Sequence, residues 1–174
     1  MRPTEIAVLF DHLYWMRDRI LEAADNAAVS LTGTDHATIR DLRTTLVHEL
    51  DVEWSWRERL RGPDPTQFAP DDEELEPEDF PSIAAIRGRW SEDEAAMRTW
   101  LATLDDAALG APCRAEADAG RHPFWFHLQH LYTHAIQQFS DCAVLLTASG
   151  RSPGELDFLD FALERERRTA RGEP

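Results

Sequence analysis

The sequence predicts an all-α protein: a four-helix bundle with a long crossover loop and a short C-terminal helix. Four segments repeat apolar residues every three or four positions, which is the periodicity of an amphipathic helix. Stretches rich in proline and glycine separate these segments, and no stretch shows strand-like alternation. The chain has 174 residues, of which 43% are hydrophobic, so it can bury one sizeable core. We therefore expect a single bundle domain over residues 1–174.

The first two helices are expected over residues 4–28 and 39–61. Each carries an apolar stripe at helical spacing. Thr38 and Asp41 form a Thr-x-x-Asp start signal before the second apolar run. Gly62, which a proline follows, is a stop signal for that helix.

The last two long helices are expected over residues 82–104 and 123–149. Pro123 suits the first turn of a helix, and Gly150 suits the position after its last residue. A shorter helix is expected to begin after Ser152. We expect each long helix to bury one leucine in the core, namely Leu13, Leu46, Leu101 and Leu131.

The connections differ in length and charge. Residues 29–37 and 105–121 read as ordinary connections, since both contain glycine. Residues 62–81 hold five prolines and the acidic run 71–74. Such a segment buries little apolar surface, so we expect a long surface loop that crosses between the two bundle halves. Residues 165–174 are expected to form a flexible tail.

Composition excludes several classes of protein. The formal net charge is −15, and all eighteen basic residues are arginine. A nucleic-acid partner is not expected, because phosphate backbones repel an acidic surface. A membrane partner is not expected either, since the longest uncharged apolar run, 142–150, is far short of the ~20 residues that span a bilayer. Residues 1–10 lack the pattern of a signal peptide, so we expect a cytoplasmic protein.

The fourth long helix carries a polar stripe that could bind a metal. Residues three or four positions apart share one face of a helix and lie about 5–6 Å apart, close enough for two imidazoles to hold one ion. Imidazole suits zinc, nickel, copper and ferrous iron. His48 on the second helix and His12 on the first could complete such a site. The alternative is that these histidines only line a surface or bond to neighbours. The stripe consists of His127, His130, His134, Gln138 and Asp141.

Three segments of the chain resemble the DinB family of helical bundles. The first is the LVHEL stretch at 46–50, which Glu53 and Trp56 follow. The second is the PFW stretch at 123–125, which leads into HLYTH at 130–134. The third is the LL pair at 145–146, which the GRSPGELD stretch at 150–157 follows. The likeness spans nearly the whole chain in order.

This resemblance implies a four-helix bundle that commonly holds a divalent metal with three histidines. One family ligand falls at His48. The other two fall within an H-x-x-x-H-x-x-x-H-R stretch, whose three histidine places are His130, His134 and Gln138 here, followed by Phe139. The chain therefore has glutamine at one expected ligand position. Three outcomes follow from this departure. In the first, His48 and His134 hold the ion with His130, His12 or Gln138 as the third ligand. In the second, the ion binds weakly. In the third, the site is lost.

The resemblance implies a thiol S-transferase that depends on a divalent metal, zinc or nickel. Its co-substrate would be a low-molecular-weight thiol, and its substrate an electrophilic small molecule, as in detoxification. The alternative is a non-catalytic bundle with a degraded metal site that binds a small molecule, or a basic partner through the acidic run 71–74. A hydrolase-like relative is a third possibility within the family. A homodimer is also expected, with residues 158–163 contributing an exposed apolar face.

Overall fold

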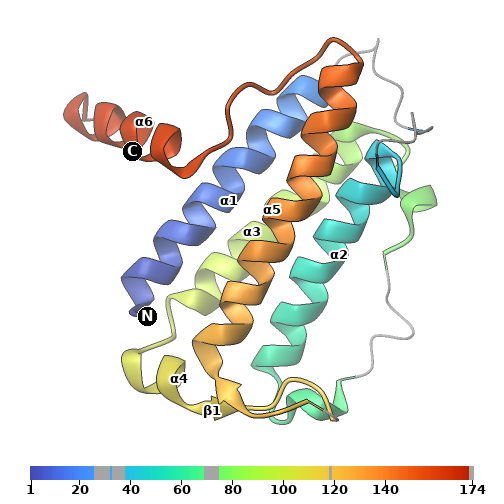
Figure 1. The fold of residues 1–174 in the computed structure, drawn as a ribbon. Coiled ribbons are helices and arrows are strands. Elements are labelled where there is room, and N and C mark those ends of the chain that lie inside the picture. The colour runs from blue at the N-terminus through green and yellow to red at the C-terminus, as the bar shows by residue number, and fades with distance from the viewer. Residues whose placement is uncertain (26–31, 33–37, 69–74, 118, 173–174) are drawn as a thin grey trace.

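Four long helices pack around one core in the computed structural model, which describes residues 1–25, 32, 38–68, 75–117 and 119–172 (Figure 1). The all-α bundle that the sequence predicts is confirmed. Among the described residues, no helix combines the length and the apolar character needed to cross a membrane. The long helices are α1 (Pro3–Ala24), α2 (Leu42–Arg61), α3 (Ile83–Leu101) and α5 (Phe124–Ala148).

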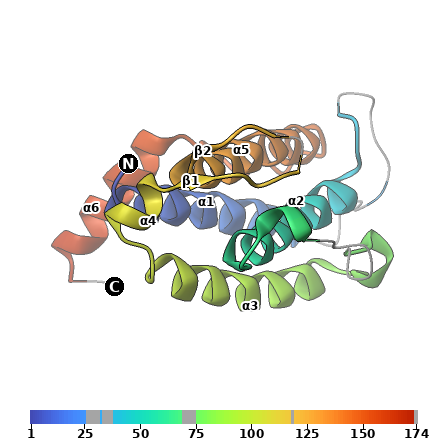
Figure 2. The same ribbon diagram turned by 90° about the horizontal axis from the view of Figure 1, so that it is seen from below.

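The bundle places α2 and α5 side by side, which matters for the histidines that they carry. Helix α5 also contacts α1, and α3 contacts both α1 and α2 on the other side (Figures 1 and 2). Helices α1 and α5 run in one direction, and α2 and α3 run in the other (Figure 1). Because α2 and α3 are parallel, the chain between them must return along the length of the bundle, as predicted for the crossover. Its described parts include the 3₁₀ turns Pro65–Gln67 and Pro77–Asp79, while the acidic run 71–74 lies outside the described residues.

Capping side chains set the starts of the helices. The Asp41 carboxylate accepts a hydrogen bond of 2.8 Å from the Thr44 N–H, so α2 begins at Leu42 and not at residue 39. Ser82 caps α3 in the same way through the Ala85 N–H, at 3.2 Å. Local capping chemistry thus moves the start of α2 by one turn from the position that its apolar stripe suggested.

The helix ends were less well predicted than the helices themselves. Helix α1 ends at Ala24, and residues 26–28 of its predicted span lie outside the described residues. Helix α3 ends at Leu101, so its predicted end at 104 is too late. Helix α5 ends at Ala148, close to the predicted 149. Gly150 follows with φ of +72°, a left-handed conformation that glycine adopts without strain. The Arg151 N–H then bonds to the Leu146 carbonyl at 2.8 Å, as in a Schellman motif.

The connection between α3 and α5 has more structure than predicted. It contains the short helix α4 (Asp106–Gly110) and the two-residue strands β1 (Pro112–Cys113) and β2 (His122–Pro123). The strands pair in antiparallel fashion. The described part of the chain is all-α apart from this pair of strands. A two-residue strand is too short to show any alternation in the sequence.

The C-terminal helix extends into residues that were expected to form a tail. Helix α6 (Phe158–Ala170) includes residues 165–170, so the prediction of a tail from 165 is wrong over that part. Asp157 caps the helix by accepting from the Leu159 and Asp160 N–H groups. Helix α6 lies across α1, outside the four-helix core (Figure 1). Only one side of α6 packs on the bundle, so most of its residues are polar. A mostly polar sequence at the end of a chain is also typical of a tail.

The core contains three of the four predicted leucines. Leu13, Leu46 and Leu131 are 1% exposed or less. Leu101 is only partly buried, so that prediction is wrong. Leu101 is the last residue of α3 and packs against the edge of the core.

Candidate metal site

Two histidines face each other across the interface of α2 and α5. The rings of His48 and His134 are 5.3 Å apart between centroids. Both side chains are half-buried, and 17% of the His134 side chain is exposed. Imidazoles at this separation can approach one ion from two helices, which is how bundles commonly build metal sites.

A buried carboxyl group lies behind one of these rings. The Nδ1 atom of His134 and the Oε2 atom of Glu49 share a hydrogen bond of 2.6 Å. Glu49 is only 1% exposed. Burial raises the pKa of Glu49 well above its ordinary value. The contact with Glu49 engages Nδ1 of His134, and Nε2 is the remaining ring nitrogen of that side chain.

The surroundings lower the pKa of both imidazoles. Burial, followed by the Arg40 guanidinium and His134, lowers the pKa of His48 to about 4. Burial, followed by Arg40, also lowers the pKa of His134. A neutral imidazole has a free lone pair, which a metal ion requires. The electrostatics of the pair are therefore compatible with metal binding at neutral pH.

Gln138 lies one helical turn beyond His134 on α5. Its side chain is 9% exposed, and its Oε1 atom is buried without a hydrogen-bond partner among the described residues. A buried acceptor left without a partner costs free energy, so it is an unusual feature of a folded protein. The amide oxygen is thus available to a donor or a cation at the position where the family pattern has its last histidine.

The remaining histidines of the α5 stripe point along the interface toward Trp56. His130 is exposed, and its ring lies 6.1 Å from His134 but 5.0 Å from Trp56. His127 is buried, stacks on Trp56 at 6.1 Å, and donates through Nε2 to the Cys113 carbonyl at 3.4 Å. Over the described part of the chain, no three His, Cys, Asp or Glu side chains converge as a metal site.

His12 belongs to a different part of the structure. It is 2% exposed, and Nε2 donates to the Leu156 carbonyl at 3.0 Å while Nδ1 bonds to the Tyr132 hydroxyl at 2.9 Å. Both ring nitrogens are therefore engaged, and His12 serves to attach the C-terminal segment to α1. His122 is exposed and stacks on Phe126. His36 lies outside the described residues.

Sequence reasoning missed the buried charged residues of α2. Glu49, Glu53 and Arg57 are all between 1% and 4% exposed. Glu53 accepts hydrogen bonds from the Tyr14 hydroxyl and from the Trp90 indole N–H, the latter at 2.9 Å. A signal was available, because these charged residues recur every four positions and follow the buried Leu42 and Leu46 on α2.

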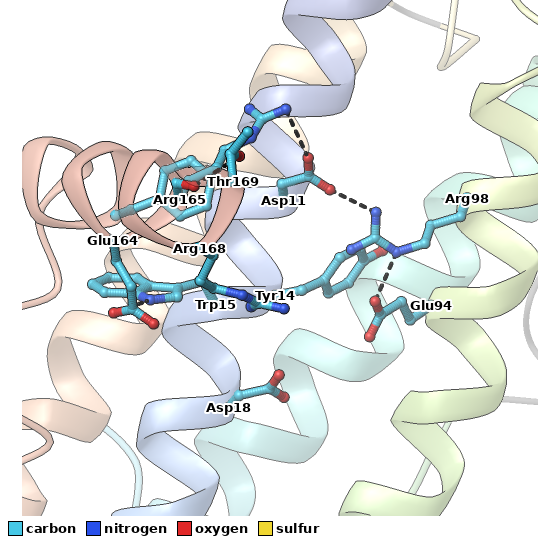
Figure 3. A pocket seen from close by; sticks show the side chains of 11 residues that line it. Asp11, Tyr14, Trp15, Asp18, Glu94, Arg98, Glu164, Arg165, Arg168 and Thr169 are labelled. Atoms are coloured by element: carbon cyan, nitrogen blue, oxygen red, sulfur yellow. Dashed lines mark hydrogen bonds and ion pairs between the residues drawn. The ribbon is translucent and has the colours of Figure 1, made fainter. Parts of the chain in front are cut away.

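A cavity of about 380 Å³ lies between α1, α3 and α6, away from the histidine pair (Figure 3). The charged side chains around it pair with one another. Arg98 bonds to Asp11 at 2.6 Å and to Glu94 at 2.7 Å. Glu164 of α6 accepts from Arg19 at 2.7 Å and from the Trp15 indole at 3.2 Å. The two contacts of Glu164 attach α6 to α1, and we assign no ligand to this cavity.

The comparison with family models decides the membership of the chain. A model described as the DinB superfamily matches residues 4–139, which is more than half of the sequence. The chain belongs to the DinB superfamily. The superfamily match contains His48, His134 and Gln138, and it ends before the closing GRSPGELD segment. A comparison with curated proteins finds no match.

Proposed function

We propose that this DinB superfamily protein is a cytoplasmic thiol S-transferase that depends on a divalent metal, zinc or nickel. The observation that carries the proposal is the pair of imidazoles, His48 and His134, which face each other 5.3 Å apart. Burial lowers the pKa of both rings, which favours the neutral form that a metal ion requires. The proposed co-substrate is a low-molecular-weight thiol, and the proposed substrate is an electrophilic small molecule.

The donor set fits a divalent ion with one weak ligand. His48 and His134 would supply two imidazoles, and the unpartnered Gln138 Oε1 would supply an amide oxygen. An amide oxygen suits harder ions than imidazole does, so this set should bind zinc or nickel less tightly than three histidines would. When bound, the ion would lower the pKa of a thiol and so supply a thiolate nucleophile.

The side chains around the pair have separate roles in this proposal. His48 and His134 stay neutral and present ring nitrogens. Trp56 and His130, whose rings are 5.0 Å apart, lie along the same interface and provide an aromatic surface beside the thiol position. In the reaction, the sulfur–hydrogen bond of the thiol breaks and its proton goes to solvent. The sulfur then forms a bond to the electrophilic carbon, and the leaving group on that carbon departs with the electron pair of the bond that breaks.

Two measurements test the proposal. The metal content of protein purified without a histidine tag is measured first, and near-stoichiometric zinc or nickel is expected. The metal-loaded protein is then incubated with a thiol and a generic electrophile, and turnover above buffer is expected. The His134→Ala variant is the control and should lose both metal and turnover. A loaded protein that shows no turnover with any thiol would contradict the transferase.

The alternative proposal is a non-catalytic bundle that binds a small molecule or a partner. It is favoured by glutamine at a ligand position and by the lack of a three-residue His, Cys, Asp or Glu site in the described ranges. Protein that stays metal-free after zinc or nickel addition would support this alternative over the enzyme.

We also propose that two copies associate through α6. Its outer side exposes Leu159 by 74% and Leu163 by 47%, with Phe158 beside them at 39%. Large apolar side chains that gather on one surface commonly mark an interface.

A further inference from the structure

Glu49 is a buried acid whose position is not explained by the packing of the bundle. It is 1% exposed, and burial of a carboxyl group costs free energy unless a partner compensates. In the described part of the molecule, His134 is the hydrogen-bond partner of its carboxyl group, at 2.6 Å. An apolar residue at position 49 would avoid this cost, so the acid points to a role at His134.

Glu53, one turn further along α2, provides the contrast. It is equally buried, but its carboxyl oxygens accept from Tyr14 of α1 and Trp90 of α3. Glu53 therefore ties three helices together in the interior. Glu49 instead turns to α5 and meets one imidazole of the histidine pair. The two glutamates share chemistry and burial but differ in what they contact.

We infer that Glu49 is the positioning residue of the histidine pair. It holds the His134 ring through Nδ1, keeps that ring facing His48, and leaves Nε2 for an ion. This inference rests on the proposed metal site and adds the residue that prepares it. Histidine ligands commonly donate their second ring N–H to a carboxylate, which fixes the tautomer and the ring orientation. Here that partner is already in place in the structure.

The position of Glu49 also makes the arrangement rigid. The acid belongs to the same helix as His48 and is adjacent to it in sequence, while His134 belongs to α5. One contact between the helices therefore fixes His134 relative to His48. Without a hydrogen-bonding group at position 49, the His134 ring is free to turn about its side-chain torsions and to leave His48.

The first test needs no metal. Nuclear Overhauser contacts between the ring C–H protons of His48 and His134 are measured in the metal-free protein. Wild type should show a cross-peak. Glu49→Met should lose the cross-peak, because methionine has a similar volume but forms no strong hydrogen bond with Nδ1. Glu49→Gln should keep it, because its amide group can accept from Nδ1–H or donate to Nδ1. Glu53→Gln is the matched control and should keep it as well.

The second test measures zinc affinity of the same variants by competition with a chromophoric chelator. Loss of a carboxylate partner of a histidine ligand typically weakens metal binding by about 10- to 100-fold. We expect a loss in this range for Glu49→Met, a smaller loss for Glu49→Gln, and wild-type affinity for Glu53→Gln. Circular dichroism verifies that each variant is folded. If Glu49→Met does not fold, Glu49→Asp replaces it, because its shorter side chain cannot reach Nδ1.

The outcomes separate this inference from the proposed function. A cross-peak that persists in Glu49→Met, or zinc binding that equals wild type in that variant, would overturn the positioning role. If the cross-peak behaves as expected but wild type itself binds no zinc, the metal-dependent function fails while the positioning of His134 by Glu49 stands.

Discussion

The imidazole rings of His48 and His134 lie 5.3 Å apart, one on α2 and the other on α5. The two helices are neighbours in the bundle, and the rings meet at their interface. Gln138 follows one turn beyond His134 with an amide oxygen that has no partner among the described residues. In the proposed metal site, the pair and the amide are the ligands, which suggests how to strengthen metal binding.

Gln138→His should tighten zinc or nickel binding, because an imidazole replaces a weak amide oxygen. We expect a gain of at least about tenfold, which corresponds to about 1.4 kcal/mol. Isothermal titration calorimetry of the metal-free protein and the variant measures the difference. The double variant Gln138→His/His134→Ala is the control and should lose the gain. Equal affinities of Gln138→His and wild type would show that position 138 does not reach the ion.

The stability of the protein should fall as pH rises from about 4.5 to about 8, in part because of Glu53. Burial raises the pKa of this carboxyl group to about 8. The folded state therefore holds a proton that the unfolded state releases above its ordinary pKa. Between the two pKa values the folded state binds more protons, so the free energy of unfolding decreases with pH. Above a pH of about 8, Glu53 is ionised in both the folded and the unfolded state, so its contribution to the free energy of unfolding no longer changes with pH.

Glu53→Gln isolates that effect, since glutamine does not ionise and can still accept from Tyr14 or Trp90. Urea unfolding at pH 5, 7 and 9 compares the variant with wild type. The wild type should lose more stability between pH 5 and pH 9 than the variant does. Parallel pH profiles would mean that Glu53 ionises at an ordinary pKa in the folded protein.

Leu131→Ala should destabilise the protein by about 2–5 kcal/mol, which is the usual range for a buried leucine that leaves a cavity. Leu131 is 1% exposed and belongs to the core. Leu101→Ala is the matched control and should cost clearly less, because Leu101 is only partly buried. Chemical unfolding monitored by circular dichroism measures both. Similar losses in the two variants would contradict the burial difference.

Leu159→Glu together with Leu163→Glu should convert a dimer into a monomer if α6 is the contact. Both side chains are exposed in the single chain, so the change should leave the fold and the melting temperature of the monomer nearly unchanged. Sedimentation velocity of wild type and variant measures the mass. Ile39→Glu is the control, because Ile39 is 90% exposed and does not belong to α6. A wild type that sediments as a monomer would remove the dimer proposal.

Much of the fold could be predicted from local sequence. Apolar spacing locates the four long helices, and Asp41 and Ser82 cap two of them through neighbouring backbone N–H groups. Gly150 marks the end of α5 through its own conformation. Helix α6 was only partly predicted, because its single buried side, anchored by Phe161, depends on contact with α1.

The sequence by itself determined the helices, the position of His48 and His134 on two of them, and the departure at Gln138. These features depend on spacing within one segment or on resemblance to a family. Only the tertiary structure decided that Glu49 meets His134, that Glu53 meets Tyr14 and Trp90, and that His12 turns to the C-terminal segment. A charged residue at an apolar position shows that a partner is needed, but the rotation of each helix and its neighbours decide which partner it meets.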